Sequence, residues 1–188
     1  MDAVFHFLKS LFTQEPYALI AWPTAAMLLG TVLRALLGKQ ASRLAIVPRT
    51  LAGLPGIATG PFVHGNFAHF AANVVPFVVL GALVLRHGEH AFVTAALLIA
   101  AGSGLLLWLF GRQAAHMGMS GVIFGFFGYL VAVAYITRSV GNVLIAAAVL
   151  LLYGSMLAGI KPARNGTSWE GHLFGLLAGI ATAWFVRH

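Results

Sequence analysis

The chain has 188 residues, of which 60% are apolar and only 8% are charged, and its formal net charge is +7. A soluble domain carries about 25% charged residues, and a disordered chain is poor in apolar ones, so both classes are excluded and a lipid bilayer is the expected solvent. Cysteine is absent, which excludes a disulfide framework and a thiolate metal site, and the basic charge suits anionic lipid headgroups rather than nucleic acid, because polar residues are few.

Residues 1–15 predict a short amphipathic helix that lies on the membrane surface. Its apolar side chains share one helical face, and its polar side chains fall elsewhere. The apolar set is Val4, Phe5, Leu8, Leu11 and Phe12. The segment is not interpreted as a signal peptide, because it lacks the sequence of a charged start, an apolar run and a small-residue cleavage site.

Six apolar stretches follow, and each is long enough to cross a bilayer as a helix, for which about 20 residues are needed. They are expected at 16–37, 66–85, 91–110, 118–136, 142–160 and 171–186. Runs of this length are too long for the strands of a membrane barrel. The predicted fold class is therefore an all-α membrane protein, a six-transmembrane-helix bundle that forms a single domain over residues 16–188.

The connections between these spans differ in character. Residues 38–67 form the longest connection, and their apolar and aromatic content predicts a structured loop partly embedded in the interface. Residues 161–170 form a polar loop. Basic residues fall on both sides of the expected bundle, so the positive-inside rule leaves its orientation open.

Polar residues are costly inside a membrane and are candidates for function. At the start of the second span, His69 and Asn73 lie one helical turn apart on the same face, and His64 precedes the helix at its junction with the loop. A single histidine at this depth can simply sit among the headgroups, but two histidines and an asparagine at one membrane edge favour a site.

The fourth span begins with a Gly-x-Ser-Gly string formed by Gly118, Ser120 and Gly121. Glycines recur along this span at intervals of three and four residues, which predicts a stripe where another helix approaches closely. Ser120 is either a candidate nucleophile or one more small packing residue.

The sixth span begins at His172, beside a second stripe of small residues that contains Gly175 and Gly179. This histidine is either a functional group or a headgroup anchor. Because successive spans alternate in direction, the second, fourth and sixth begin on the same side of the membrane. The polar residues at their starts are therefore expected to converge, and the glycine stripes allow Ser120 to meet His172.

Other intramembrane chemistries lack the residues they need. Asp2 is the only aspartate and no glutamate lies inside an expected span, which excludes a two-aspartate protease. The sequence has no His-Glu-x-x-His string, which excludes the zinc proteases that use it. No metal and no cofactor is expected.

Together these motifs resemble the rhomboid family of intramembrane serine proteases. The resemblance covers nearly the whole chain. It rests on three motifs, which occur in the order and at the places in the spans that the family shows: His64, His69 and Asn73; Gly118 to Gly121; and His172, Gly175 and Gly179. It implies that Ser120 is the catalytic nucleophile and His172 the general base. It also implies that His69 and Asn73 help to bind the oxyanion.

The remaining matched positions have supporting roles by the same resemblance. His64 steadies the first long loop, and Phe124 packs against the catalytic histidine. Some members carry tyrosine in place of Phe124, so any hydroxyl role is lost here. The motif glycines Gly118, Gly121, Gly175 and Gly179 belong to the supporting set.

By the same resemblance, the expected partners are protein substrates that the chain cleaves in their transmembrane segments, together with the lipid bilayer. The chain itself is expected to be a multi-pass protein of a prokaryotic cell membrane. Glu170 lies off the face of His172, so helix packing rather than a carboxylate is expected to hold the imidazole, and turnover is expected to be slow. Two alternatives remain: a catalytically inactive rhomboid-like protein that binds or escorts membrane proteins, and a small channel or transporter.

Overall fold

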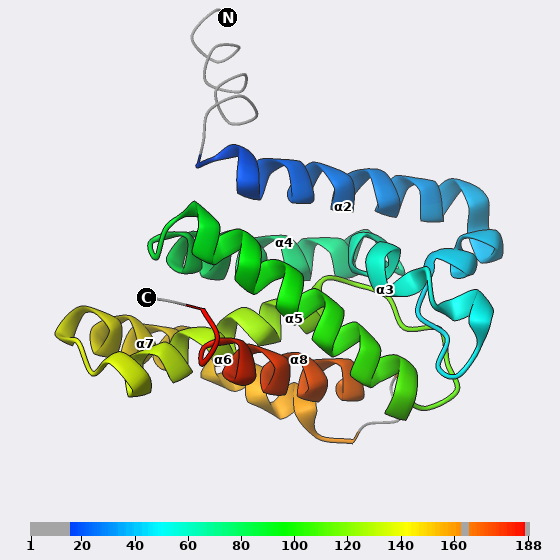
Figure 1. Ribbon diagram of the computed structural model, residues 1–188. Helices are drawn as coiled ribbons and strands as arrows, with labels where there is room; N and C mark the ends of the chain where they lie inside the picture. Colours follow the sequence, from blue (N-terminus) through cyan, green and yellow to red (C-terminus); the bar gives the residue numbers. More distant parts are fainter. Residues whose placement is uncertain (1–15, 163–165, 187–188) are drawn as a thin grey trace, which may run out of the picture.

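The computed structural model describes residues 16–162 and 166–186, and in that part of the chain the regular elements are all helices, with one isolated β-bridge. The amphipathic helix expected over residues 1–15 lies outside the described residues. The long helices, in chain order, are α2 (Ala18–Leu37), α4 (Phe67–Leu85), α5 (Glu89–Phe110), α6 (Ser120–Thr137), α7 (Val140–Tyr153) and α8 (Trp169–Thr182). They form one bundle (Figure 1).

Among the described residues, five segments are long and apolar enough to cross a membrane: α2, α4, α5, α6, and α7 continued by the 3₁₀ helix η4 (Gly154–Ile160). The chain is thus an integral, multi-pass membrane protein. The fifth span departs from a uniform α-helix, because it tightens into 3₁₀ geometry after Tyr153.

The sixth predicted span, 171–186, is the element whose helix differs most from expectation. α8 has 14 residues and is followed by turns that reach Val186. At about 1.5 Å per residue it is about 21 Å long, less than the roughly 30 Å of a hydrocarbon core. α8 packs closely against α5 and α6, and it also exposes Leu177 and Ile180 on its surface.

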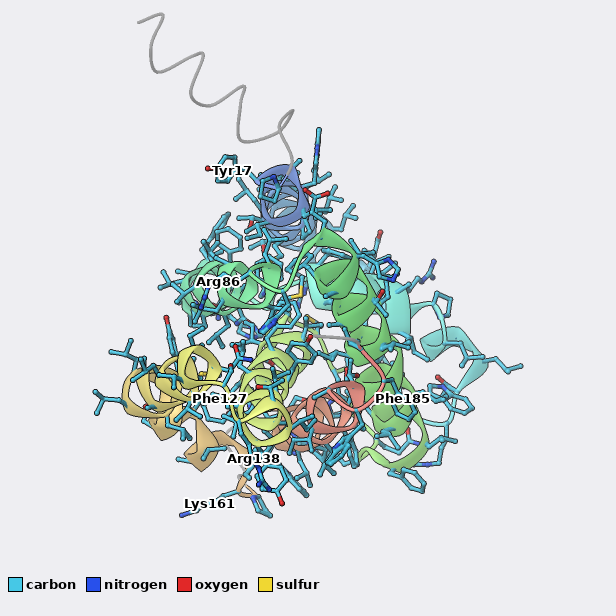
Figure 2. The ribbon with its side chains drawn as sticks, turned by 60° about the vertical axis from the view of Figure 1, so that its left-hand side comes forward. Tyr17, Arg86, Phe127, Arg138, Lys161 and Phe185 are labelled. Atoms are coloured by element: carbon cyan, nitrogen blue, oxygen red, sulfur yellow. The ribbon has the colours of Figure 1, made fainter. Side chains whose placement is uncertain are left out.

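α6 occupies the centre of the bundle, with α4, α5, α7 and α8 around it (Figure 2). Of the 18 residues of α6, 61% are buried, whereas 11% are buried in the most apolar 18-residue stretch of Val140–Ile160. The core is formed around α6 by large side chains such as Phe126, Tyr129 and Leu130. The nucleophile candidate Ser120 is the first residue of this central helix.

The glycine stripes of α6 and α8 lie against each other, as predicted. A Cβ atom on Gly175 would collide with the backbone of Gly121, and one on Gly179 would collide with the backbone of Gly125. Only residues without a side chain permit this close backbone approach. The approach brings the first turn of α8 beside the first turn of α6.

The long connection between α2 and α4 is structured, as predicted. It contains η1 (Gly38–Leu44), η2 (Leu51–Gly53), α3 (Gly56–Thr59) and η3 (Gly60–Phe62). Ile46 exchanges two backbone hydrogen bonds of 2.9 Å with His116, and the N–H of Gly118 donates to the carbonyl of Gly60 at 2.9 Å. The connection is therefore fastened to the segment that leads into Ser120.

Candidate active site

Ser120 and His172 are in hydrogen-bond contact. The distance from Ser120 Oγ to His172 Nε2 is 3.0 Å. Ser120 opens α6 and His172 lies in the first turn of α8, so the glycine contact between these helices is what brings the two groups together.

A backbone carbonyl determines which nitrogen of His172 carries the proton. His172 Nδ1 lies 3.0 Å from the carbonyl oxygen of Gly159, in η4. A carbonyl can only accept, so in the neutral ring Nδ1 donates the hydrogen bond and Nε2 is left free to accept from the Ser120 hydroxyl. This tautomer is the one that a general base for Ser120 requires.

Packing fixes the plane of the imidazole. The ring of Phe124 stacks on that of His172, with centroids 4.3 Å apart and an interplanar angle of 6°. Gly159 borders both rings, because a Cβ there would lie 3.0 Å from His172 Nδ1 and 3.2 Å from Phe124 Cζ. Gly159 is a site residue that the sequence analysis missed, and because it acts through its backbone no side-chain pattern could have indicated it.

A cavity of about 720 Å³ opens over the Ser120–His172 pair. His69 and Asn73 from α4 line it together with Ser120, His172 and Phe124. The cavity is large enough for many water molecules, whose individual share of liquid volume is about 30 Å³. The space over the pair can therefore hold water.

Asn73 and His69 are arranged on the first two turns of α4, which Asn66 caps by accepting from the His69 N–H at 2.8 Å. Asn73 Nδ2 donates to the His69 carbonyl at 2.8 Å, which uses one of its two N–H groups. Its Oδ1 is buried and has no partner. Gly118 has φ +114°, and a Cβ there would lie 2.8 Å from His69 Cε1, so a glycine is needed to make room for the imidazole.

His64 lies outside the lining of this cavity and connects three elements instead. Its Nε2 accepts from the backbone N–H of Met119 at 3.4 Å, and its Nδ1 lies 3.3 Å from Thr31 Oγ1 in α2. The Thr31 hydroxyl donates to the carbonyl of Met27, so the His64 Nδ1–H is the donor to Thr31. A neutral His64 thus joins α2, the long connection and the residue before Ser120.

Burial, with the ring of His69 5.1 Å away, lowers the pKa of His64 from 6.5 to about 4. Between pH 6.5 and pH 4 the unfolded chain binds this proton and the folded chain does not, so stability falls as the pH decreases through that window. The loss attributable to His64 is about 3 kcal/mol. We expect the thermal unfolding midpoint in detergent to fall between pH 6.5 and 4, and to fall less in His64→Gln, which keeps a donor and an acceptor but does not titrate. Equal pH dependence in both proteins would contradict this assignment.

Glu170 occupies a place that the sequence analysis did not foresee. It lies off the face of His172, as expected, but it is buried and forms an ion pair with Arg112 at 3.0 Å. A lone glutamate at the edge of a polar loop carries no sequence signal for burial, because its partner lies 58 residues away in the chain. Within residues 16–162 and 166–186, no group of three or more metal-ligating side chains comes together.

Comparisons with known proteins find a matching family and related sequences. The family model described as "Rhomboid domain" matches residues 51–188. Uncharacterized proteins of Mycobacterium tuberculosis and Mycobacterium bovis are each 35% identical over 150 residues, which cover 75% of this chain and 62% of theirs. The Rhomboid-like protein 11, chloroplastic, of Arabidopsis thaliana is 28% identical over 142 residues, which cover 68% of this chain and 51% of that protein.

The chain therefore spans less than two thirds of the length of the curated relatives it matches. The matched region nevertheless contains every helix from α4 to α8, with all the residues that line the cavity except Arg34. On the strength of a family match that covers well over half of its residues, the chain belongs to the rhomboid family.

Proposed function

We propose that this protein is an intramembrane serine endopeptidase that cleaves transmembrane segments of membrane proteins with a Ser120–His172 dyad. The observation that carries the proposal is the 3.0 Å contact between Ser120 Oγ and His172 Nε2, in a ring whose other nitrogen donates to a carbonyl. Serine is a weak nucleophile until a neighbouring base takes its proton, and this contact supplies the base.

The reaction follows from the positions of these groups. Ser120 Oγ attacks the scissile carbonyl carbon while His172 Nε2 takes the hydroxyl proton. The negative oxygen of the tetrahedral intermediate lies near the start of α6, where backbone N–H groups lack acceptors within the helix. His172 then returns the proton to the departing amine, and the acyl-enzyme that remains is hydrolysed by water from the cavity through the same two steps.

In the part of the chain that the structure describes, no carboxylate forms a hydrogen bond with His172, and this has a catalytic consequence. In a soluble triad a carboxylate stabilises the imidazolium that forms when the base takes its proton. Here the carbonyl of Gly159 accepts the Nδ1 hydrogen bond but carries no full charge. Slow turnover is the expected result.

Substrates of this proposed reaction reach the site through the bilayer. The window over Val140–Ile160 is only 11% buried, which makes α7 and η4 the least enclosed of the five membrane-crossing segments. The cavity is lined by residues of α4 and by Met156 and Gly159 of η4. Movement of η4 away from α4 would open the cavity to a helix in the membrane, so this span is the proposed lateral gate.

The test is cleavage of a model transmembrane substrate in proteoliposomes that contain the full chain. We expect wild type to cleave it and to be labelled by a fluorophosphonate, and Ser120→Ala to do neither. Ser42→Ala, in η1 away from the cavity, is the matched control and retains both activities. An inactive membrane-protein binder is the alternative function, and it is favoured if wild type is neither labelled nor able to cleave while it still retains the substrate.

His69 and Asn73 are the proposed side-chain donors to the negative oxygen of the intermediate, and this role yields a separate prediction. Removing one such donor costs about 2.7–4 kcal/mol in the barrier, so we expect His69→Ala and Asn73→Ala each to lower kcat by about 10²–10³-fold. His69→Ala has the larger effect, because one Asn73 N–H is already occupied by the His69 carbonyl. KM changes little, since the charge that these groups bind exists only after attack.

The matched control for this pair is Asn142→Ala, at the start of α7, where the amide donates to Thr137 instead of facing the cavity. Steady-state cleavage kinetics measure all three variants. Wild-type kcat in both His69→Ala and Asn73→Ala would reject the oxyanion assignment.

A further inference from the structure

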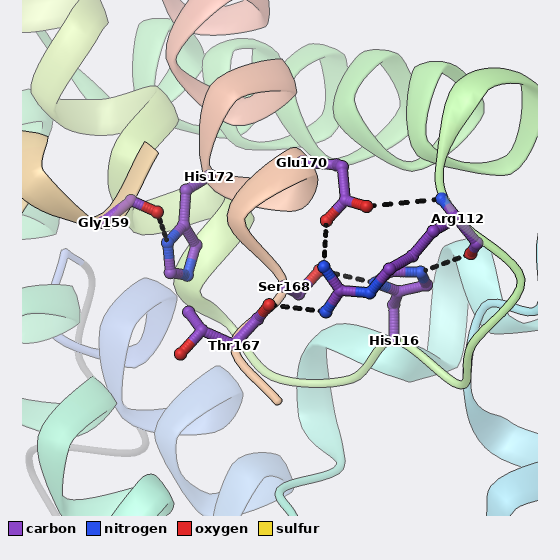
Figure 3. A network of polar contacts seen from close by, with 7 residues as sticks. All are labelled: Arg112, His116, Gly159, Thr167, Ser168, Glu170 and His172. Atoms are coloured by element: carbon purple, nitrogen blue, oxygen red, sulfur yellow. Dashed lines mark hydrogen bonds and ion pairs between the residues drawn. The ribbon is translucent and has the colours of Figure 1, made fainter. Parts of the chain in front are cut away.

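A buried charged cluster connects the loop before α6 to the start of α8 (Figure 3). Glu170 is 4% exposed, and its carboxylate accepts from the Arg112 guanidinium at 3.0 Å and from the Arg112 backbone N–H at 3.3 Å. A second guanidinium nitrogen of Arg112 donates to the carbonyl of Thr167 at 2.6 Å. Within the described part of the chain, Glu170 is the only buried acidic side chain.

His116 adds a second connection beside the ion pair. Its Nε2 lies 3.0 Å from the carbonyl of Arg112 and its Nδ1 lies 2.6 Å from Ser168 Oγ. Burial lowers the pKa of His116, which favours the neutral ring. The carbonyl must accept, so Nε2–H donates to it, and the Ser168 hydroxyl donates to Nδ1.

The hydrogen bonds of this cluster join residues that precede His172 in the chain to residues that precede Ser120. Thr167, Ser168 and Glu170 immediately precede His172, and the Ser168 carbonyl accepts the His172 N–H at 3.2 Å, which is the first hydrogen bond of α8. On the other side, Arg112 and His116 belong to the segment that leads into Ser120. The cluster therefore links the segment before α8 to the segment before α6.

Stability alone does not account for a pair in which Glu170 is buried and Arg112 is partly exposed. Desolvation of the carboxylate offsets much of the attraction between the two charges, and water screens the exposed guanidinium. Geometry is a stronger reason, because a displacement of about 1 Å at a reacting group can cost 10²-fold in rate.

We propose that Arg112 and Glu170 are positioning residues that hold the first turn of α8, and with it the His172 imidazole, over Ser120. The inference rests on the proposed function and extends it. Glu170 does not touch the imidazole; it acts through the helix start, in place of a carboxylate that would contact the ring directly.

The test uses Glu170→Leu and Glu170→Gln in the full chain, reconstituted with the model transmembrane substrate. The Arg112 side chain is 37% exposed, so it can turn to water when its partner is lost, whereas removal of Arg112 would strand a buried carboxylate. Arg138→Gln is the matched control, since Arg138 lies at the opposite end of α6 and its guanidinium is over the ring of Tyr135.

We expect Glu170→Leu to lower kcat by about 10–100-fold, with KM within about twofold of wild type, because the dyad and not the substrate contact is disturbed. Amide hydrogen exchange over residues 168–172 becomes faster, and exchange in the rest of α8 is unchanged. Glu170→Gln keeps one acceptor for Arg112, so its kcat lies between those of Glu170→Leu and wild type.

Wild-type kcat in Glu170→Leu overturns the positioning role. A raised KM with unchanged kcat also overturns it, since Arg112 would then act on the substrate from the cavity wall that it lines. If Glu170→Leu does not fold, Glu170→Gln decides: a lower kcat at constant KM supports the role and an unchanged kcat rejects it. Failure of the proposed function is distinct, because wild type itself would then neither cleave nor be labelled.

Discussion

Replacement of His172 by alanine is expected to lower kcat by roughly 10⁴-fold or more, which is the scale seen when a serine hydrolase loses its base. The physical reason is the single contact of 3.0 Å between its Nε2 and Ser120 Oγ, the only base within reach of that hydroxyl in the described structure. Fluorophosphonate labelling of Ser120 is lost as well, because it needs the same proton transfer. The measurements are proteoliposome cleavage and labelling.

His90→Ala is the control for this substitution, since His90 is an exposed residue in the first turn of α5. A second arm is the double variant Ser120→Ala with His172→Ala. The effects on kcat of substituting two residues that act as one unit do not add, so the double variant is no slower than either single variant. Additive losses would mean that the two side chains act independently.

Gly175→Val is expected to lower the unfolding free energy by about 3 kcal/mol or more, at or beyond the upper end of ordinary overpacking. A Cβ at Gly175 meets the carbonyl oxygen, the carbonyl carbon and the Cα of Gly121, and a backbone cannot turn away as a side chain can. The helices must separate, so the distance between Ser120 and His172 grows and labelling is lost together with stability. Thermal unfolding in detergent and labelling of the folded fraction measure the two effects.

Gly141→Ala is the matched control for Gly175→Val. Gly141 lies in α7 and an added Cβ there meets nothing within 4 Å, so the substitution removes only the backbone freedom of glycine. A small gain in stability and unchanged labelling are expected. If Gly175→Val unfolded at the wild-type temperature and was labelled normally, α6 and α8 would not pack as described.

The membrane-crossing helices were predictable because hydrophobicity is a local property of a stretch of residues. α2, α4, α5 and α6 each begin and end within a few residues of the expected bounds. The length of α8 was not predictable in the same way. Hydropathy shows that residues 171–186 are apolar, but it does not show that the α-helix ends at Thr182 and that turns continue to Val186.

The juxtaposition of Ser120 and His172 was also predictable, from alternating span direction and from two glycine stripes. The contacts that hold the His172 imidazole in place were not predictable. The carbonyl of Gly159 contributes no side-chain pattern, and the expected reliance on helix packing omitted this hydrogen bond. The stacking of Phe124 was implied only by family resemblance.

The sequence by itself determined that the chain is a helical membrane protein of the rhomboid kind, because apolar length and motif order are written along the chain. Tertiary structure alone decided the tautomer of His172, the burial of Glu170 against Arg112 and the bracing of Met119 by His64. Each of these depends on a hydrogen bond between residues at least 13 positions apart, and such a bond forms only when packing brings the two groups within about 3 Å.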